Sequence, residues 1–246
     1  MKIMSELLLI GKELPDCLDF AESLTKNGRK VFTTSKDDNK IADFEAENIF
    51  SASWNKASAI SSRALLIKAE TKLQDTNEYI IYFDSQNYAQ KFDSDRTDTI
   101  SMAVDAMINS YQLFLSELLF RLDQKKENAI ITFLVKTYPS KYEVAHFGSK
   151  NVNMHPSSNI VNAAQQAFIS LAENISTLVG ERPYLSVLLA KCEPSNELFS
   201  SEKALAEWTV QGMDTIKNMK NHQTAKQAET WVKAGAKVPT GFSLFK

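Results

Sequence analysis

The sequence lacks the features that mark membrane, secreted and nucleic-acid-binding proteins. Its longest apolar runs, such as LLLI at 7–10, are far too short to span a bilayer. The N-terminus lacks the small-residue cleavage site and the longer apolar region of a secretory signal. The formal net charge is only −2, so no broad positive charge points to nucleic acid or to an anionic membrane. We therefore expect a cytoplasmic protein with no nucleic-acid or membrane partner.

Cysteine and histidine are also scarce, which argues against metal chemistry. The two cysteines, Cys17 and Cys192, do not have the spacing of a metal site. His146, His155 and His222 are scattered, with no carboxylate or cysteine at metal-ligand spacing. We expect no metal site, and we interpret the cysteines as buried packing residues.

What is present is the composition of an ordinary globular protein. Of the 246 residues, 43% are apolar and 24% are charged. An undivided α/β domain can reach this length. No linker, tandem repeat or low-complexity segment interrupts the chain, so we expect a single domain over 1–246.

Apolar segments of strand and helix character alternate along the whole chain. We expect a first helix with Pro15 in its first turn and its end near Gly28. Residues 136–158 are expected to form a loop. The other helices are predicted at 56–73, 100–122, 160–180, 202–221 and 224–233, and strands at 6–10, 30–35, 49–51, 78–83, 128–135, 183–190 and 241–245. This alternation predicts an α/β fold with a three-layer, doubly wound parallel sheet of about seven strands, similar to a Rossmann fold.

Two helices carry marked apolar faces. In 56–73, an apolar face is formed by Ala57, Ile60, Ala64 and Ile67. In 100–122 a wider stripe runs through Met107, Tyr111, Phe114, Leu118 and Leu122, and Ile108, Leu115, Leu119 and Phe120 extend it. The second stripe is wider than one sheet face can cover, which indicates a contact with another chain.

The order and spacing of these elements resemble the short-chain dehydrogenase/reductase family over nearly the whole chain. In that family the turn after the first strand reads T-G-x-x-x-G-x-G, and here only Gly11 remains of its glycines. Ala21 and Gly28 also fall where the family has alanine and glycine, and Thr240 with Gly241 matches the start of the family's C-terminal motif. The resemblance implies an NAD(P)-binding type of fold and a homodimer or homotetramer built on the long helices 100–122 and 160–180.

The family's catalytic residues are not found at the aligned positions. Its Tyr-x-x-x-Lys pair aligns with Val161 and Gln165, which cannot titrate. Residues 82–85 (YFDS) replace its N-N-A-G turn, and Ser140 comes too late to be its serine. Tyr138 and Tyr142 offer an alternative phenol. We therefore assign no catalytic residue.

Asn109 aligns with an asparagine that supports a proton-relay water in the family. Since its catalytic partners are missing, we interpret Asn109 as satisfying a local kink or as a polar core residue.

Cofactor binding is expected to be absent or weak. Pro15 removes a backbone donor, and Asp16 brings a carboxylate to the helix end where a pyrophosphate would bind. If a dinucleotide does bind, Gly11, Lys12, Ser35 and Lys36 are the candidate residues. Ser35 and Lys36 stand where an acidic residue would select NAD, which favours NADP. The alternative is that Lys36 simply begins the solvated loop SKDDNK at 35–40, in which Asp37 and Asp38 cancel much of its charge.

Three functional hypotheses remain open. The first is a divergent member of this family that has lost the usual catalysis and serves as a binding or interaction scaffold for an unidentified small molecule or protein. The second is an NAD(P)-dependent oxidoreductase with non-standard catalytic residues. The third is another α/β nucleotide-binding enzyme, because one scaffold can host many functions.

Overall fold

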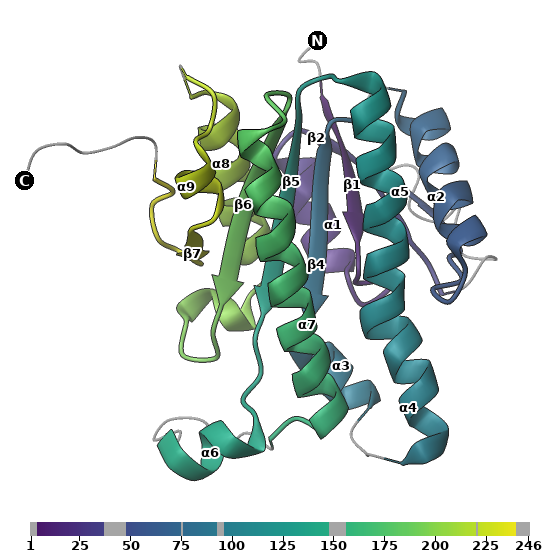
Figure 1. Ribbon diagram of the computed structural model, residues 1–246, viewed down its shortest axis with the longest axis vertical. Coiled ribbons are helices and arrows are strands. Elements are labelled where there is room, and N and C mark those ends of the chain that lie inside the picture. Colours follow the sequence, from purple (N-terminus) through teal and green to yellow (C-terminus); the bar gives the residue numbers. More distant parts are fainter. Residues whose placement is uncertain are drawn as a thin grey trace, which may run out of the picture.

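The computed structural model describes residues 4–36, 48–74, 76–92, 96–147, 156–219 and 221–239. Its centre is a seven-stranded sheet in the order β3-β2-β1-β4-β5-β6-β7, with every neighbouring pair parallel (Figure 1). The strands are β1 (Ser5–Ile10), β2 (Arg29–Thr34), β3 (Ile49–Ala52), β4 (Glu78–Asp84), β5 (Ala129–Lys136), β6 (Leu185–Cys192) and β7 (Trp231–Lys233). The predicted doubly wound parallel sheet is confirmed.

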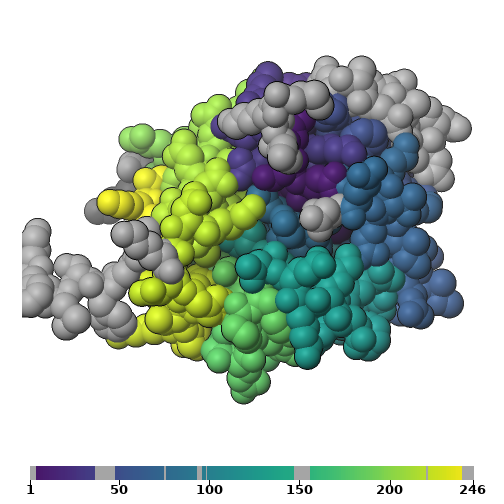
Figure 2. All heavy atoms as spheres, turned by 90° about the horizontal axis from the view of Figure 1, so that it is seen from above, coloured from purple at the N-terminus to yellow at the C-terminus, as the bar shows by residue number. Residues whose placement is uncertain are grey.

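Helices cover both faces of this sheet. They are α1 (Leu18–Lys26), α2 (Ala59–Leu73), α3 (Ser85–Lys91), α4 (Thr97–Val104), α5 (Ser110–Lys125), α6 (Lys141–Phe147), α7 (Asn159–Ser176), α8 (Glu202–Lys217) and α9 (Ala225–Ala228). A π-helical segment (Asp105–Asn109) joins α4 to α5, and short 3-10 turns cover Thr177–Gly180 and Glu197–Ser200. In Figure 2, which looks along the strands, the teal and green segments of α5 and α7 lie on the opposite side from the purple segment of α1.

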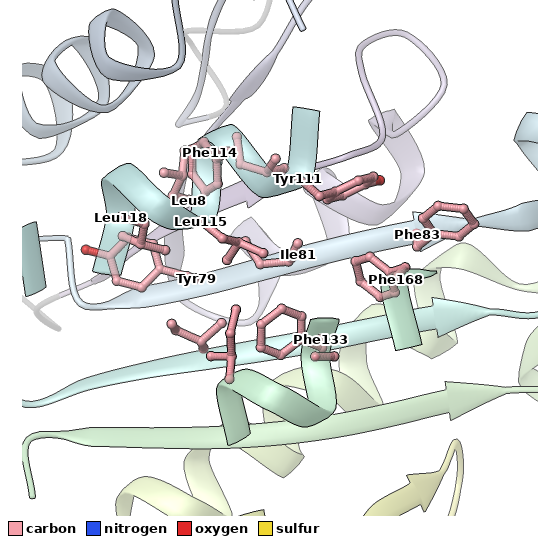
Figure 3. Packing of buried hydrophobic residues seen from close by; sticks show 14 of the residues in the cluster. Leu8, Tyr79, Ile81, Phe83, Tyr111, Phe114, Leu115, Leu118, Phe133 and Phe168 are labelled. Carbon is pink, nitrogen blue, oxygen red and sulfur yellow. The ribbon is translucent and has the colours of Figure 1, made fainter. Parts of the chain in front are cut away.

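Two apolar clusters fill the spaces between these layers. The strands alternate their side chains between the faces, so Leu8 and Ile10 pack under α2, α5 and α7, whereas Leu7 and Leu9 pack under α1 and α8. Phe168 of α7 anchors the first cluster, its ring centroid 5.0 Å from that of Phe83 and 5.1 Å from that of Tyr111 (Figure 3). Packing of this kind explains why the central strands read as nearly continuous apolar runs.

Several sequence-based boundaries were wrong. The seventh strand is Trp231–Lys233, inside the segment predicted as a helix, because this segment pairs with Leu189–Lys191 of β6. The strand predicted at 241–245, with Thr240 and Gly241, lies outside the described residues. Helix α1 begins at Leu18, so Pro15 lies in the preceding loop, where the Leu14–Pro15 peptide bond is cis. The predicted loop 136–158 contains α6, and α3 was not predicted.

The two apolar helix faces also differ from expectation. On α2, Ile60 and Ile67 are 81% and 48% exposed, and the buried face is formed instead by Ser62, Leu65, Leu66, Ala69 and Leu73. The stripe on α5 is buried within the chain itself, whereas Phe120 remains 55% exposed. None of the helices in the described ranges is long and apolar enough to cross a bilayer.

Candidate functional site

The carboxyl ends of β1 and β4 meet where the strand order reverses, which is the place where open α/β sheets bind ligands. Gly11 follows β1 with a φ of +111°, and a side chain there would collide with the carbonyl oxygen of Tyr82 on β4. Tyr111 Oη donates to that same carbonyl at 2.8 Å. Tyr88 Oη lies 3.2 Å from the Gly11 carbonyl oxygen and 3.0 Å from Tyr111 Oη. Packing against β4 alone therefore requires glycine here, whatever binds nearby.

Four side chains form ion pairs at these strand ends, a region that we call the crevice. Together they make the buried ion cluster: Lys12, Asp84, Lys136 and Glu202. Lys12 Nζ lies 2.7 Å from Asp84 Oδ2 and 3.0 Å from Glu202 Oε1. Lys136 Nζ lies 2.8 Å from the same Glu202 oxygen. Tyr82 Oη donates to Glu202 at 3.1 Å. The cluster is charge-balanced and hydrogen-bonded, which is the condition for placing ions in a protein interior.

Burial and charge compete in this cluster. Burial lowers the pKa of Lys12, but Asp84 and Glu202 outweigh it and raise the pKa above its ordinary value. Burial raises the pKa of Tyr82 well above its ordinary value, and the neighbouring carboxylates add to this effect. Lys12 therefore stays an ammonium and Tyr82 a neutral phenol at neutral pH, so neither is poised to exchange a proton.

The loop after β1, residues 11–17, is bound to the sheet by its own backbone. We call it the β1 loop. The amide of Leu14 donates to the Thr34 carbonyl at 2.8 Å, and Leu14 forms a parallel bridge with Ser35 at the end of β2. The amides of Cys17 and Leu18 donate to the carbonyls of Glu13 and Pro15. These amides belong to the turn that a pyrophosphate would otherwise face.

Ion pairs also fix the side chains of the β1 loop. Asp16 Oδ2 lies 2.6 Å from Lys36 Nζ and 3.2 Å from Lys91 Nζ, and Asn87 Nδ2 donates to it at 3.3 Å. Burial would raise the pKa of Asp16, but the hydrogen bond from Lys36 and the charge of Lys91 lower it to about 2. Burial and the nearby charge of Lys36 lower the pKa of Lys91. Among the residues that the structure describes, two lysines thus face the single carboxylate of Asp16.

The four candidate cofactor residues are brought to one edge of the sheet but have different surroundings. Gly11 and Lys12 lie in the crevice between β1 and β4, where Lys12 is 7% exposed and faces carboxylates. Ser35 is buried, pairing with the β1 loop, and Lys36 lies at the surface. The positive charge of Lys36 is therefore accessible to a phosphate, whereas that of Lys12 is buried and paired with carboxylates.

A pyrophosphate does not fit the crevice as it stands. It would have to displace the backbone pairing of Leu14 with β2, and it would bring its charge beside Asp84 and Glu202. Leaving one buried charge without its partner costs about 3–5 kcal/mol.

The two α7 positions that the sequence comparison aligned with the family's tyrosine and lysine carry no titratable group. Val161 is fully buried and Gln165 is 4% exposed. Ser85 Oγ donates to Gln165 Oε1 at 2.7 Å, and the Tyr138 amide donates to the same oxygen at 3.0 Å. Gln165 thus ties the end of β4 to the segment after β5.

The alternative residues considered from the sequence are dispersed. Tyr138 is half-buried, whereas Tyr142 is 64% exposed on α6, where its ring stacks on His146. Asn109 is exposed in the π-helical segment and donates to Asp105 Oδ1 at 2.8 Å. The interpretation of Asn109 as a core residue is therefore wrong. Its hydrogen bond to Asp105 lies within the π-helical segment, which agrees with the other interpretation, a local role at a helix irregularity.

A cavity of about 640 Å³ opens beside this region, between α7, α6 and the ends of β5 and β6. Its lining includes Thr137, Gln165 and Ile169, with Trp231 of β7 at its border. The volume lies in the range of small-molecule sites. The sequence carried no signal for this cavity, because its lining comes from separate elements without a motif.

The thiols and imidazoles of the described residues form no reactive centre. Burial raises the pKa of Cys17 to about 12 and that of Cys192 to about 12, so both remain thiols. His146 and His222 are exposed, and His155 lies outside the described residues. No group of three or more His, Cys, Asp or Glu side chains in the described ranges is arranged to hold a metal ion.

No protein-family model and no curated protein matches this sequence. Solved structures do match it. A 3-ketoacyl-(acyl-carrier-protein) reductase from Brucella melitensis, complexed with NADH, aligns with a TM-score of 0.58 and 11% identity over 94% of this chain and 97% of that chain.

Two further solved structures agree. An alcohol dehydrogenase from Thermococcus sibiricus, complexed with 5-hydroxy-NADP, has a TM-score of 0.60 and 10% identity over 96% of this chain and 99% of that chain. A short chain dehydrogenase from Mycobacterium smegmatis has a TM-score of 0.64 and 10% identity over 95% of this chain and 93% of that chain. The chain therefore has the short-chain dehydrogenase/reductase fold, and the resemblance seen in the sequence is confirmed at that level.

Proposed function

We propose that this chain is a divergent short-chain dehydrogenase/reductase-like protein that binds a ligand or partner without transferring hydride. The observation that carries this proposal is the pair Val161 and Gln165 on α7, buried where the family has its tyrosine and lysine. Reducing a carbonyl group requires a proton as well as a hydride. A valine and an amide held by Ser85 and Tyr138 cannot supply that proton.

The buried ion cluster supports absent or weak dinucleotide binding. In a dinucleotide-binding fold, the loop after the first strand leaves its amides open to the pyrophosphate. Here the β1 loop pairs with β2, and Lys12 and Lys136 are already neutralised by Asp84 and Glu202, so their charge is not free for a phosphate. Titrations of the pure protein with NADH, NAD, NADPH and NADP should accordingly give no heat, or only weak binding.

A specific observation favours NADP if any dinucleotide binds. Lys36 and Lys91 both approach Asp16 at the end of β2, and Lys56 pairs with Glu13 nearby in the β1 loop. No acidic residue at position 35 would repel a 2′-phosphate, because Ser35 stands there. This arrangement supports the alternative function, an NADP-dependent oxidoreductase with non-standard catalytic residues.

One experiment separates the two functions. Absorbance at the reduced nicotinamide band, followed with NADPH across a panel of aldehydes and ketones, should stay flat. Turnover that disappears in Tyr138→Phe or Tyr142→Phe would establish the alternative instead. NADP binding that is weakened at least tenfold by Lys36→Ala, with no turnover, would support a binding role at the end of β2.

We also propose that the protein acts in the cytoplasm as one domain. Cys17 and Cys192 are free and buried, as expected for a chain kept in a reducing compartment. Cell extracts separated by sedimentation, with the native protein detected in each fraction, check this placement.

A further inference from the structure

The cavity beside α7 has a buried hydrogen-bond donor at one end. Gln165 lines the cavity and is 4% exposed. A backbone amide can only donate, so the Gln165 atom that faces the Tyr138 amide must be the oxygen. Nε2 remains as a donor, and it has no acceptor among the described residues. It is not one of the fully buried, unpartnered side-chain atoms of the described chain, so it is open to the cavity.

A hydrogen-bond acceptor lies at the same end of the cavity. Glu143 of α6 lines the cavity, and its Oε2 accepts from the Ser140 amide at 2.7 Å. Ser140 and Tyr138 are two residues apart, so their backbone nitrogens are separated by at most about 7 Å. Since one of these amides binds Gln165 and the other binds Glu143, both side chains stay at this end. Glu143 Oε1 accepts no hydrogen bond from a described residue, so this end offers one donor and one acceptor.

This donor and acceptor together favour an uncharged ligand group. A carboxylate or phosphate could accept from Gln165 but would be repelled by Glu143. An ammonium group would pair with Glu143 but cannot accept from Gln165, and a ketone satisfies Gln165 alone. A secondary amide satisfies both side chains, because its planar group carries a carbonyl oxygen and an N–H that point in opposite directions.

Beyond this end the cavity wall is apolar. Ile169 lies four residues after Gln165 on α7, about one helical turn further along, and it lines the cavity. Val144 of α6 is also part of the lining, and Trp231 of β7 borders the far end. A ligand held at Gln165 therefore meets apolar surface along the rest of its length.

The far end of the cavity does not select a charged group. Lys191 Nζ lies 3.3 Å from Glu193 Oε1, and Lys233 Nζ lies 3.7 Å from the other oxygen of Glu193. Glu173 Oε1 accepts from Trp231 Nε1 at 2.8 Å. Two lysines and two glutamates thus balance among the described residues there, which suits an uncharged ligand.

We propose that this cavity binds an uncharged small molecule in which a secondary amide is joined to an apolar chain. The carbonyl oxygen accepts from Gln165 Nε2, and the N–H donates to Glu143 Oε1. The apolar chain lies along Ile169 toward Trp231. This inference deepens the proposed binding function and rests on it, since it assigns a ligand class to a chain that transfers no hydride.

Matched probes test each group of this ligand by calorimetric titration of the full chain. N-hexylacetamide carries the secondary amide and an apolar chain. 2-Nonanone has CH2 in place of the N–H, N-hexylthioacetamide has sulfur, a weak acceptor, in place of the oxygen, and octanoate carries a negative charge. N-hexylacetamide should bind at least tenfold more tightly than each of the other three. Equal binding of any of the three, or no heat from N-hexylacetamide, would overturn the proposal.

A change at an exposed position tests the acceptor without disturbing the core. In Glu143→Gln the side-chain oxygen stays with the Ser140 amide, so an NH2 group replaces Oε1 opposite the ligand N–H. This variant should weaken binding of N-hexylacetamide at least tenfold and leave that of 2-nonanone unchanged. Glu207→Gln, an exposed change on α8 at the other face of the sheet, is the matched control and should leave all affinities unchanged. Unchanged binding of N-hexylacetamide to Glu143→Gln would refute the assigned acceptor.

A second variant tests the place of the apolar chain. Ile169→Trp puts a larger side chain on the cavity wall and leaves Gln165 and Glu143 in place. It should weaken binding of N-hexylacetamide and of 2-nonanone at least tenfold. Unchanged binding of both probes would show that they bind outside this cavity.

Failure of this ligand class can be distinguished from failure of the proposed function. No heat from N-hexylacetamide, together with a flat nicotinamide absorbance, would reject the ligand class and keep the non-redox assignment. Oxidation of NADPH in the presence of 2-nonanone would reject the non-redox assignment regardless of the affinity for N-hexylacetamide.

Discussion

At the scale of single residues, Asp16 shows how a side chain can be assigned to the right place with the wrong partner. The sequence predicts that its carboxylate lies at the end of the first helix, where a pyrophosphate would bind. The helix begins at Leu18, and the Asp16 carboxylate is held by Lys36, Lys91 and Asn87 instead. These partners come from β2 and α3, so their proximity to Asp16 could not be read from local sequence.

We predict that Asp16→Asn lowers the free energy of unfolding by roughly 1 kcal/mol at neutral pH, which is what partly exposed ion pairs contribute at most. The folded pKa of Asp16 is lowered to about 2 from an ordinary 3.8, so its contribution is complete well above pH 3.8. It is lost as the pH falls through about 2. Urea unfolding at a series of pH values should therefore show the difference between wild type and variant shrinking as the pH falls.

Asp19→Asn is the control for this prediction. Asp19 lies in α1 and its carboxylate is 66% exposed, 3.3 Å from Lys203 Nζ. Its substitution should change stability by less than about 0.5 kcal/mol. If the difference in unfolding free energy between wild type and Asp16→Asn stays constant down to the lowest pH, the assigned ion pairs are contradicted.

The candidate cofactor residues illustrate what sequence can establish at this scale. Gly11 could be found because a turn after a buried strand favours glycine, but its cause lies in Tyr82 and Tyr111, which come from β4 and α5. Lys12 could be noted as a positive charge beside that glycine. Its carboxylate partner Glu202 begins an unremarkable helix far along the chain, so the buried ion cluster had no sequence signature.

At the scale of secondary-structure elements, periodicity located helices better than it chose their buried faces. In α2 the apolar residues surround much of the helix, so two faces competed. Leu65 and Leu66 are 1% and 2% exposed, whereas Ile60 is 81% exposed. The choice between faces is made by how α2 packs against α5 and the sheet, which no local pattern encodes.

We predict that Leu66→Ala lowers the free energy of unfolding by roughly 2–4 kcal/mol, because it opens a cavity in the core. Ile60→Ala on the same helix should change it by less than about 0.5 kcal/mol, because its side chain stays in solvent. Urea denaturation of the two variants measures both values. A larger loss for Ile60→Ala than for Leu66→Ala would mean that α2 buries the face predicted from the sequence.

The strong elements were predictable and the short ones were not. Strands β1, β4, β5 and β6 are buried apolar runs whose existence follows from composition. β7 has only three residues, and α3 and α6 have seven each, so neither periodicity nor length separates them from loops. These short elements border or cap the carboxyl edge of the sheet, which is why the site was harder to predict than the fold.

At the scale of the whole molecule, we propose a homodimer in which α5 and α7 pack against their copies. These helices lie on the same face of the sheet (Figure 1), and Phe120 of α5 is 55% exposed. The apolar stripe on α5 is covered within the chain, so the argument now rests on the outward side of the helices and on the family resemblance.

Light scattering at micromolar concentration should give a mass twice the 27.6 kDa of one chain. Phe120→Glu should shift this mass toward the monomer, because it places a charge in the contact. Ile60→Glu, at a more exposed apolar position on α2, should leave it unchanged. A monomeric wild-type protein would reject the dimer, and a dimer broken by Ile60→Glu alone would move the contact to α2.

The buried ion cluster has a consequence for how this protein responds to its surroundings. A fold that relies on a bound dinucleotide gains stability by mass action, so its melting temperature rises with cofactor concentration. Here Lys12 and Lys136 find their counter-charges in Asp84 and Glu202 of the same chain. Under the proposed function, the charge balance of the crevice is therefore constant. The protein would keep one thermal stability as the nicotinamide pool of a cell fills or empties.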